Sequence, residues 1–164
     1  MNVTNFIWGA ALLLTALMAG LYYAYSCSVN PGLGQLADGD YIKAMQSINR
    51  AIQNPVFFVG FFGPVVLLPV LVFLVRGNDS KVCIALVVAS AVLYIFGSFG
   101  VTIFCNVPLN EQLDKVDVAS QSTESLKEIA ATFKSKWNSW HSVRTMASIL
   151  SLIALVAGCM VRGK

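Results

Sequence analysis

One short stretch of the chain holds the side chains best suited to chemistry, Trp137-Asn138-Ser139-Trp140-His141-Ser142-Val143-Arg144-Thr145. Residues three or four positions apart share a face of a helix, so the two tryptophans, His141 and Arg144 are expected on one side. His141 is the only histidine of the chain and can take up and release a proton near neutral pH. Arg144 stays protonated and can hold a carboxylate, a phenolate or a developing oxyanion. The stretch predicts His141 and Arg144 as catalytic residues, with Trp137 and Trp140 as walls for an aromatic ligand.

The same residue types also occur as membrane anchors. Trp and Tyr are enriched at water–lipid boundaries, and an arginine there can extend its head group to water. The aromatic residues near the span ends fit such belts: Trp8, Tyr22, Tyr23, Tyr25, Trp137 and Trp140. In this interpretation the cluster carries no chemistry.

Four amide side chains are expected near the same membrane face: Asn106, Asn110, Gln46 and Asn49. Asn106 and Asn110 flank a Pro-Leu pair and suit helix capping, because Asn satisfies freed backbone groups at helix ends. Gln46 and Asn49 also fit simple polarity on a helix surface. In the functional alternative, all four line a substrate pocket roofed by the two connections on that face.

The sequence assigns no metal ligands and names no cofactor. A single histidine without clustered carboxylates falls short of the three protein ligands of a catalytic zinc site or the iron triad. His141 with Cys27 or Cys105 could bind copper, and His141 is the one standard axial ligand for haem, so copper or iron stays open. A disulfide between Cys27 and Cys105 requires an oxidising face, and the simpler interpretation makes the four cysteines small apolar residues.

Four long apolar runs must position these residues. They cover about 6–26, 56–75, 82–104 and 143–161, and each approaches the ~20 residues that a helix needs to cross a bilayer. The chain is 57% hydrophobic and only 12% charged, against about 25% in soluble domains. Its 164 residues are expected to form one all-α domain, an integral-membrane four-helix bundle with two helical extracytoplasmic connections. The bilayer is the predicted partner.

The sidedness follows from the short connections. Four spans place both termini and the 76–81 link on one face, which carries Arg76, Lys81, Arg162 and Lys164 against Asp79 alone. The positive-inside rule makes this face cytoplasmic. The net charge of +3 is therefore attributed to loop bias, and no nucleic-acid partner is expected because no basic cluster exists.

The larger connections have helical patterns of their own. Apolar residues recur at helical spacing from Tyr41 to Ile52, and Asn54-Pro55 is expected to end that helix and start the second span. In the second connection, Ser125 and Glu128 have the spacing of a capping box before a helix that continues into the fourth span. Pro64 and Pro69 predict a kink in the second span, which can open a cavity or simply be tolerated.

Several motifs together resemble the anthrone oxygenase-like family of membrane proteins, formerly grouped as a domain of unknown function. The motifs are Pro31-Gly32-Leu33, Met45-Gln46-Ser47-Ile48-Asn49-Arg50, Asn54-Pro55-Val56-Phe57, Asn106-Val107-Pro108-Leu109-Asn110-Glu111-Gln112-Leu113 and the Trp137…Trp140…Arg144-Thr145 block. Family members commonly show Trp-Asn-His-x-Arg-Thr. Here the histidine stands one place earlier, at His141, and Ser142 occupies the family position.

The resemblance implies a four-helix membrane protein, some of whose relatives oxidise an anthrone to an anthraquinone with dioxygen. It would make His141 the base, Arg144 the holder of the enolate, and the tryptophans the flat walls. The sequence thus suggests an integral-membrane oxygenase or oxidoreductase that acts with dioxygen on a hydrophobic phenolic or polyketide-type small molecule. The alternative is a non-enzymatic bundle, either a small-molecule binder or a subunit of a membrane complex. The oligomeric state is left open.

Overall fold

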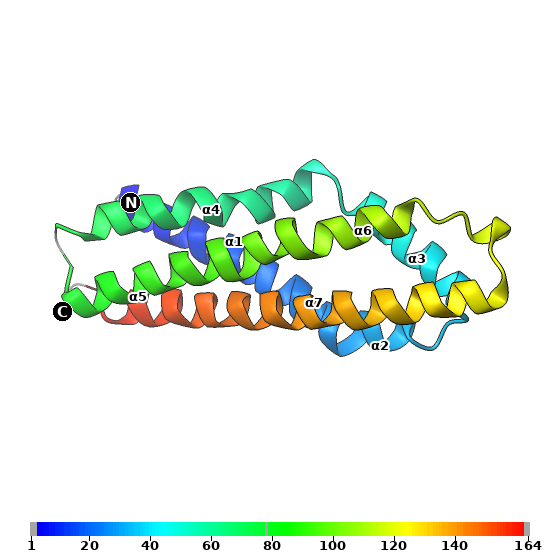
Figure 1. Cartoon of the computed structure of the whole chain (residues 1–164). Coiled ribbons are helices and arrows are strands. Elements are labelled where there is room, and N and C mark those ends of the chain that lie inside the picture. The colour runs from blue at the N-terminus through cyan, green and yellow to red at the C-terminus, as the bar shows by residue number, and fades with distance from the viewer. Residues whose placement is uncertain (1–2, 78, 163–164) are drawn as a thin grey trace.

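Four long helices form because a chain in lipid must satisfy its backbone hydrogen bonds within each spanning segment. The computed structural model describes residues 3–77 and 79–162, and within them every regular element is helical. The first two helical rods are α1 (Val3–Ala24), η1 (Tyr25–Val29) and α2 (Asn30–Leu33) in continuous succession, then α4 (Pro55–Val75). The third rod runs through α5 (Lys81–Val92), η2 (Leu93–Gly100), η3 (Thr102–Asn106) and α6 (Val107–Asp114), and the fourth is α7 (Thr123–Met160). Figure 1 shows the rods side by side in one elongated bundle.

The four rods cover the four predicted spans to within about one residue, and the first, third and fourth rods extend well past them at one end. All four are long and apolar enough to cross a bilayer, so the prediction of an all-α integral-membrane bundle is confirmed. The first larger connection holds a separate helix, α3 (Asp38–Ala51). The second connection is made mostly of the extended third and fourth rods, joined by a turn that includes η4 (Val118–Ser120).

Polar side chains fix where the helices begin. The Asn54 side chain accepts a hydrogen bond from the Phe57 amide at 3.0 Å, which confirms the predicted start of α4. Ser80 caps α5 in the same way. The predicted capping box at Ser125 is wrong, because Ser122 caps α7 by accepting from the Ser125 amide at 3.2 Å. The helix therefore starts one turn earlier than its spacing pattern indicated.

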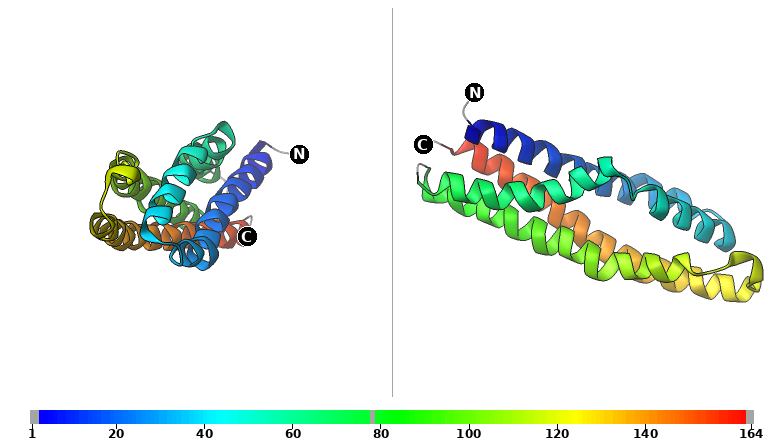
Figure 2. Two further views of the ribbon diagram at one scale, coloured as in Figure 1. Left: turned by 90° about the vertical axis from the view of Figure 1, so that its right-hand side faces the viewer. Right: turned by 90° about the horizontal axis from the view of Figure 1, so that it is seen from above.

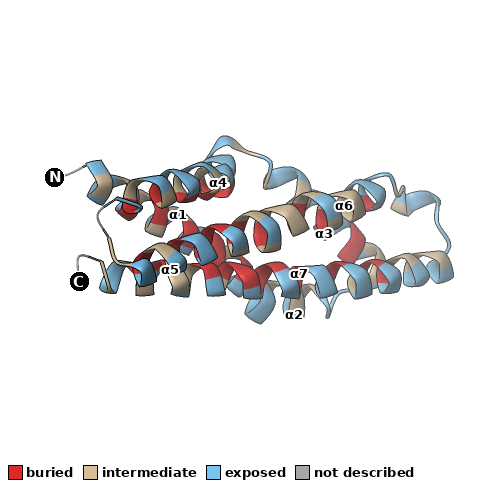
Figure 3. Ribbon diagram, turned by 60° about the vertical axis from the view of Figure 1, so that its left-hand side comes forward, coloured by how far each residue is buried: buried red, intermediate tan, exposed pale blue. Residues whose placement is uncertain are grey.

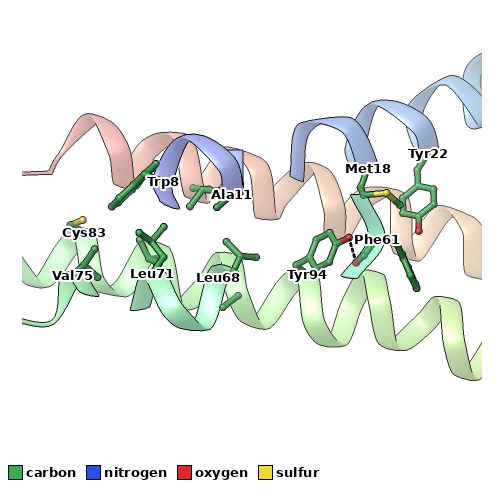
Figure 4. Packing of buried hydrophobic residues seen from close by; sticks show 13 residues of the cluster. Trp8, Ala11, Met18, Tyr22, Phe61, Leu68, Leu71, Val75, Cys83 and Tyr94 are labelled. Atoms are coloured by element: carbon green, nitrogen blue, oxygen red, sulfur yellow. Dashed lines mark hydrogen bonds between the residues drawn. The ribbon is translucent and has the colours of Figure 1, made fainter. Parts of the chain in front are cut away.

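The four rods enclose a tightly packed apolar core. Its members come from the first three rods and α7, and the buried residues lie on the faces that the helices turn to one another (Figure 3). Figure 4 shows Leu68, Leu71 and Val75 of α4 packed against Trp8 and Ala11 of α1. Since lipid is as apolar as these side chains, close packing and not exclusion from water holds the helices together.

Small polar residues line the contact between the third rod and α7. The Ser90 and Ser151 hydroxyls lie 3.0 Å apart, and Ser148 donates to Ser98 at 2.7 Å. Gly97 lies against Ala147 so closely that a Cβ on it would stand 2.6 Å from the Ala147 Cβ. Small residues of this kind let two backbones approach within a membrane. The contact brings α7 to the place where η3 begins.

A side-chain hydrogen bond lies beside the proline in the middle of α4. Pro64 has no N–H to donate to the Gly60 carbonyl one turn earlier. At the adjacent carbonyl, Phe61, the Tyr94 hydroxyl donates a hydrogen bond at 3.0 Å (Figure 4). The Tyr94 side chain thus ties η2 to the segment of α4 that carries Phe57, Phe58, Phe61 and Phe62.

At the end where the rods project, α3 packs on α6 and α7. Tyr41, Ile42 and Met45 contact Leu113, Phe133 and Trp137 in a second apolar cluster. Burial raises the pKa of Tyr41 to about 12, so its hydroxyl stays neutral. Figure 2 shows α3 on the way from the end of the first rod to the start of α4. This helix forms the roof under which a site can lie.

The start of α1, the end of α4, the start of α5 and the end of α7 lie together at the opposite end (Figure 1). That arrangement agrees with four spans. The assignment of this end to the cytoplasm stays a prediction, and Lys164, one of the four cations it used, lies outside the described residues. The predicted aromatic belts are wrong for Trp8, Tyr22 and Trp137, which are buried inside the bundle.

Candidate functional site

A cavity of about 520 Å³ lies at the projecting end of the bundle, beneath α3. Its walls come from the end of α1, η1, α3, the first turns of α4, η3, α6 and α7. The inner wall is aromatic and carries one cation; its side chains include Tyr22, Tyr25, Phe57, Phe61, Trp137 and Arg144. The outer wall is polar and exposed, and it includes Arg50, Glu111, Asp114 and Lys115. A flat apolar molecule with a negative end would match this distribution.

Arg144 is buried at the inner end of the cavity, with 8% of its surface exposed. Its Cζ lies 4.6 Å from the centre of the Tyr22 ring and 4.9 Å from the centre of the Trp137 ring. Nε donates to His141 Nδ1 at 3.2 Å, and Nη1 lies 3.4 Å from Thr102 Oγ1. None of the ion pairs found among residues 3–77 and 79–162 involves this guanidinium. The arginine thus faces an aromatic cavity and has no carboxylate of the described residues within ion-pair distance.

His141 lies behind Arg144 and does not line the cavity. It is 2% exposed and stacks on Trp137, with 4.9 Å between ring centres and 13° between planes. Tyr22 and Tyr25 meet the imidazole edge-on. Its Nε2 lies 3.0 Å from the Ser26 hydroxyl. Both ring nitrogens are therefore engaged within the protein.

Trp137 is the one predicted tryptophan on the cavity wall. Its indole N–H donates to Asn110 Oδ1 at 2.8 Å, and its ring also contacts Tyr25. Trp140 points away from the bundle and is 42% exposed, which suits the anchor interpretation. Helical spacing places both indoles on the same side of α7. Trp137, at one edge of that side, faces the interior of the bundle, and Trp140, at the other edge, faces outward.

The four predicted amides divide in the same way. Asn110 and Asn49 line the cavity, and the Nδ2 of Asn49 is buried with no hydrogen-bond partner in the described structure. Asn106 is fully buried and donates to the Trp137 carbonyl at 3.2 Å, away from the cavity wall. Gln46 donates to the carbonyls of Leu113 and Val116, both at 2.9 Å, and so fastens α3 to the end of α6. Asn49 and Asn110 therefore lie where they could contact a ligand, whereas Asn106 and Gln46 connect helices.

Several wall residues were missed by the sequence analysis. The sequence analysis assigned Tyr22 and Tyr25 to an interfacial belt and gave the phenylalanines of α4 no role beyond the second apolar run. Thr102, which contacts both Arg144 and the Tyr22 hydroxyl, carried no motif at all. One sequence feature could have indicated an aromatic cavity wall: four phenylalanines stand close together just before Pro64, at Phe57, Phe58, Phe61 and Phe62.

The described part of the chain holds three π-helical segments, η1, η2 and η3, of which η1 and η3 contribute residues to the cavity wall. Such wide turns often occur at functional positions because they change the face on which following residues lie. Here η1 carries Tyr25 and Ser26, and η3 carries Thr102 and Asn106. A regular helix register would rotate these side chains away from their present neighbours.

In the part of the chain that the structure describes, no group of three or more His, Cys, Asp or Glu side chains is close enough to hold a metal ion. All four cysteines are free, and Cys27 and Cys105 form no disulfide. Of the four, only Cys83 is fully buried, while Cys27 and Cys159 are exposed on the outside of the bundle. The expectation of four small buried residues therefore holds for Cys83 alone.

The fold and the cavity define a class of protein, a small four-span membrane bundle with a ligand cavity at one end. The chain matches the model of the family described as Anthrone oxygenase over residues 56–154, which is more than half of its length. It belongs to this family. The match contains Asn110, Trp137 and Arg144, whereas Tyr22, Tyr25 and Asn49 lie before it. Searches of curated proteins and of solved structures find no match.

Proposed function

We propose that the protein is an integral-membrane oxygenase that acts with dioxygen on a hydrophobic phenolic small molecule, as an anthrone oxygenase does. Membership of the family supports this kind of reaction. The observation that carries the proposal is the placement of Arg144, a buried cation without a carboxylate partner among the described residues, at the inner end of an aromatic cavity.

An unpaired buried cation calls for a negative partner. Removing a guanidinium from water costs several kcal/mol unless an anion and hydrogen bonds offset the loss, and ionisable residues within membrane spans generally mark functional sites. Tyr22 and Trp137 contribute cation–π contacts, but each ring offers only about 0.5–2 kcal/mol. A phenolate or enolate oxygen would supply the missing negative charge and accept from the remaining N–H donors of the guanidinium.

The reaction needs a negative intermediate of that kind. A methylene group next to an aryl ketone loses a proton to give an enolate, and the enolate reacts with O₂. Over the whole reaction, the methylene group and one O₂ become a carbonyl group and one water. Arg144 would stabilise the enolate oxygen, a contact that strengthens as charge develops there.

The cavity offers one carboxylate for the proton. Glu111 and Asp114 both line the outer wall, but Asp114 is held by Arg50, with Nη2–Oδ1 at 2.7 Å. Glu111 makes no ion pair among the described residues and is exposed. We assign proton uptake to Glu111, since a carboxylate open to water can also release the proton after each turnover.

The rest of the wall fits a flat molecule with several oxygen atoms. Trp137, Tyr25 and Phe57 supply aromatic faces. Asn110 uses its Oδ1 for the Trp137 indole, so its NH₂ group is the end that can donate to a ligand. Asn49 offers a buried NH₂ group for which the described residues provide no hydrogen-bond partner. These two amides would bind ring hydroxyl or carbonyl oxygens away from Arg144.

The test uses protein in lipid nanodiscs with 1,8-dihydroxyanthrone as the probe. Oxygen consumption and the absorbance of the quinone product report turnover. Titration of the protein with the quinone measures binding separately. We expect turnover by the wild type, a loss of kcat/KM of about a hundredfold or more in Arg144→Met, and partial retention in Arg144→Lys. Arg76→Met, at an exposed arginine of the opposite end, is the matched control and should behave as the wild type.

The same experiment tests the alternative of a non-enzymatic binder. Tight binding of the quinone without oxygen uptake in the wild type would favour a small-molecule binder built on the same cavity. Equal activity in Arg144→Met and wild type would contradict the proposed role of the arginine.

A further inference from the structure

We infer that His141 is a positioning residue, a neutral imidazole that holds Arg144 in place, and that it does not take the substrate's proton. The inference rests on the proposed function, in which Arg144 binds a phenolate or enolate. It follows from the hydrogen bonds of the two ring nitrogens and from the position of the ring behind the cavity.

The first nitrogen must carry a lone pair. Arg144 Nε lies 3.2 Å from His141 Nδ1, and a guanidinium is protonated at every physiological pH. Its Nε–H can only donate, because it has no acceptor site. His141 Nδ1 is therefore the acceptor and bears no hydrogen.

The second nitrogen must carry the hydrogen. His141 Nε2 lies 3.0 Å from Ser26 Oγ and 3.4 Å from Thr145 Oγ1. The Ser26 hydroxyl donates its hydrogen to the Tyr22 carbonyl at 3.0 Å, and the Thr145 hydroxyl donates to the His141 carbonyl at 2.7 Å. Each hydroxyl has one hydrogen, so both oxygens face Nε2 as acceptors. The imidazole is thus neutral, with its hydrogen on Nε2.

The ring has no free lone pair to offer a ligand. Trp137 covers one face of it, Tyr22 and Tyr25 meet its edges, and the cavity wall does not include it. Protonation at Nδ1 would break the bond to Arg144 and place two positive groups side by side. No carboxylate near this pair offsets such a charge in the described part of the chain.

The gain for the site is the orientation of the guanidinium. Nε is fixed by His141 and Nη1 approaches Thr102 Oγ1, so two of the three nitrogens are placed by the protein. Tyr22 and Trp137 contact the guanidinium through their rings and hold it between them. A preorganised donor of this kind binds developing negative charge without reorganising at the moment of reaction.

The direct test exploits the fact that His141 is the only histidine. Protein labelled with ¹⁵N-histidine and purified through a tag without histidine gives one imidazole in the ¹⁵N spectrum. We expect an unprotonated Nδ1 and a protonated Nε2 that do not change from about pH 5 to pH 8, the range in which an ordinary histidine titrates. An imidazolium signal at neutral pH, or the hydrogen on Nδ1, would overturn the inference.

Two substitutions separate positioning from proton transfer. In His141→Asn the side-chain oxygen can take the place of Nδ1 and accept from Arg144, whereas in His141→Gln the amide reaches the place of Nε2. The binding probes are 1,8-dihydroxyanthraquinone, which can ionise, and its dimethyl ether, which cannot. We expect His141→Asn to keep the wild-type preference for the ionisable probe within about threefold. His141→Gln should lose that preference by about tenfold or more, with unchanged affinity for the ether.

The outcomes distinguish failure of the inference from failure of the proposed function. If the wild type shows no preference for the ionisable probe, Arg144 does not bind an anion and the proposed function fails. If the wild type has the preference and both variants keep it but lose turnover by a hundredfold or more, His141 acts as the base and the inference fails. Retained binding and turnover in His141→Asn alone supports positioning.

Discussion

Trp137 is held by the same helix rod at two points, because Asn106 donates to its carbonyl at 3.2 Å and Asn110 accepts from its indole at 2.8 Å. The two asparagines are four residues apart and share a face of the rod. One can therefore bind the backbone carbonyl of Trp137 while the other binds its indole. This clamp joins the junction of η3 and α6 to α7 and fixes the indole as a cavity wall. The indole in turn supports both Arg144 and His141.

The first prediction concerns the indole N–H. Trp137→Phe keeps an aromatic ring but removes the donor, and Asn110 Oδ1 is left without it, which should cost about 1 kcal/mol of stability. Trp137→Ala should cost several kcal/mol because it also leaves a cavity beneath α3. Thermal unfolding in detergent measures both. Trp140→Phe, on the exposed side of the same helix, is the control and should change little; an equal loss there would contradict the clamp.

The second prediction concerns the ion pair at the open side of the cavity. Arg50 of α3 and Asp114 of α6 are 63% and 43% exposed at their side chains, so breaking the pair should cost at most about 1 kcal/mol. Because both residues line the cavity, Arg50→Ala should instead speed association and dissociation of the quinone probe. Stopped-flow fluorescence measures the rates. Lys127→Ala, which breaks the exposed pair with Glu124 away from the cavity, should leave them unchanged.

The fold was largely predictable from the sequence because each span is a continuous apolar run that has to satisfy its own backbone. The start of α4 at Asn54 was predictable for the same local reason, a side-chain cap before proline. The positions of the aromatic residues near the span ends were not predictable, since such residues have the same sequence pattern whether they face lipid or a partner helix. Tyr22 and Trp137 face inward because the end of α1 and η1 approach α7 there, which no local pattern encodes.

The candidate site was predictable in its residue types and only partly in its roles. Arg144 and Trp137 could be found because helical spacing brings them onto one face, and both line the cavity. The place of His141 depends on Ser26, more than a hundred residues away, and on the wide turn of η1 that presents it. Gln46 resembled a surface amide, yet it binds two carbonyls that only become neighbours in the folded chain.

The third prediction concerns Glu111. If it accepts the substrate's proton, Glu111→Gln should lower kcat by about a hundredfold or more, while the affinity for the quinone stays close to that of the wild type. Glu128→Gln, an acid of α7 outside this cavity, is the matched control. Pre-steady-state absorbance follows enolate formation directly. A normal rate of enolate formation in Glu111→Gln would show that another group, or water, accepts the proton.

The last prediction concerns the close contact that brings α7 to η3. A Cβ at position 97 would lie 2.6 Å from the Ala147 Cβ, and neither atom can swing aside. Gly97→Ala should therefore cost about 1–3 kcal/mol of stability. By forcing η2 and α7 apart it should also weaken the approach of Arg144 to Thr102 and lower the affinity for an ionisable phenol. Gly20→Ala is the matched control, since nothing lies within 4 Å of that Cβ, and should be neutral or stabilising.

A second substitution makes the cause of that loss explicit. Ala147→Gly removes the atom that the new Cβ meets, so the double variant Gly97→Ala, Ala147→Gly should recover much of the stability and of the ligand affinity that Gly97→Ala loses. A double-mutant cycle measures this coupling, which is expected only for residues in contact. Additive effects would mean that the glycine acts through backbone flexibility, whereas recovery of both properties together would show that helix separation, and not a local defect at η2, controls the position of Arg144.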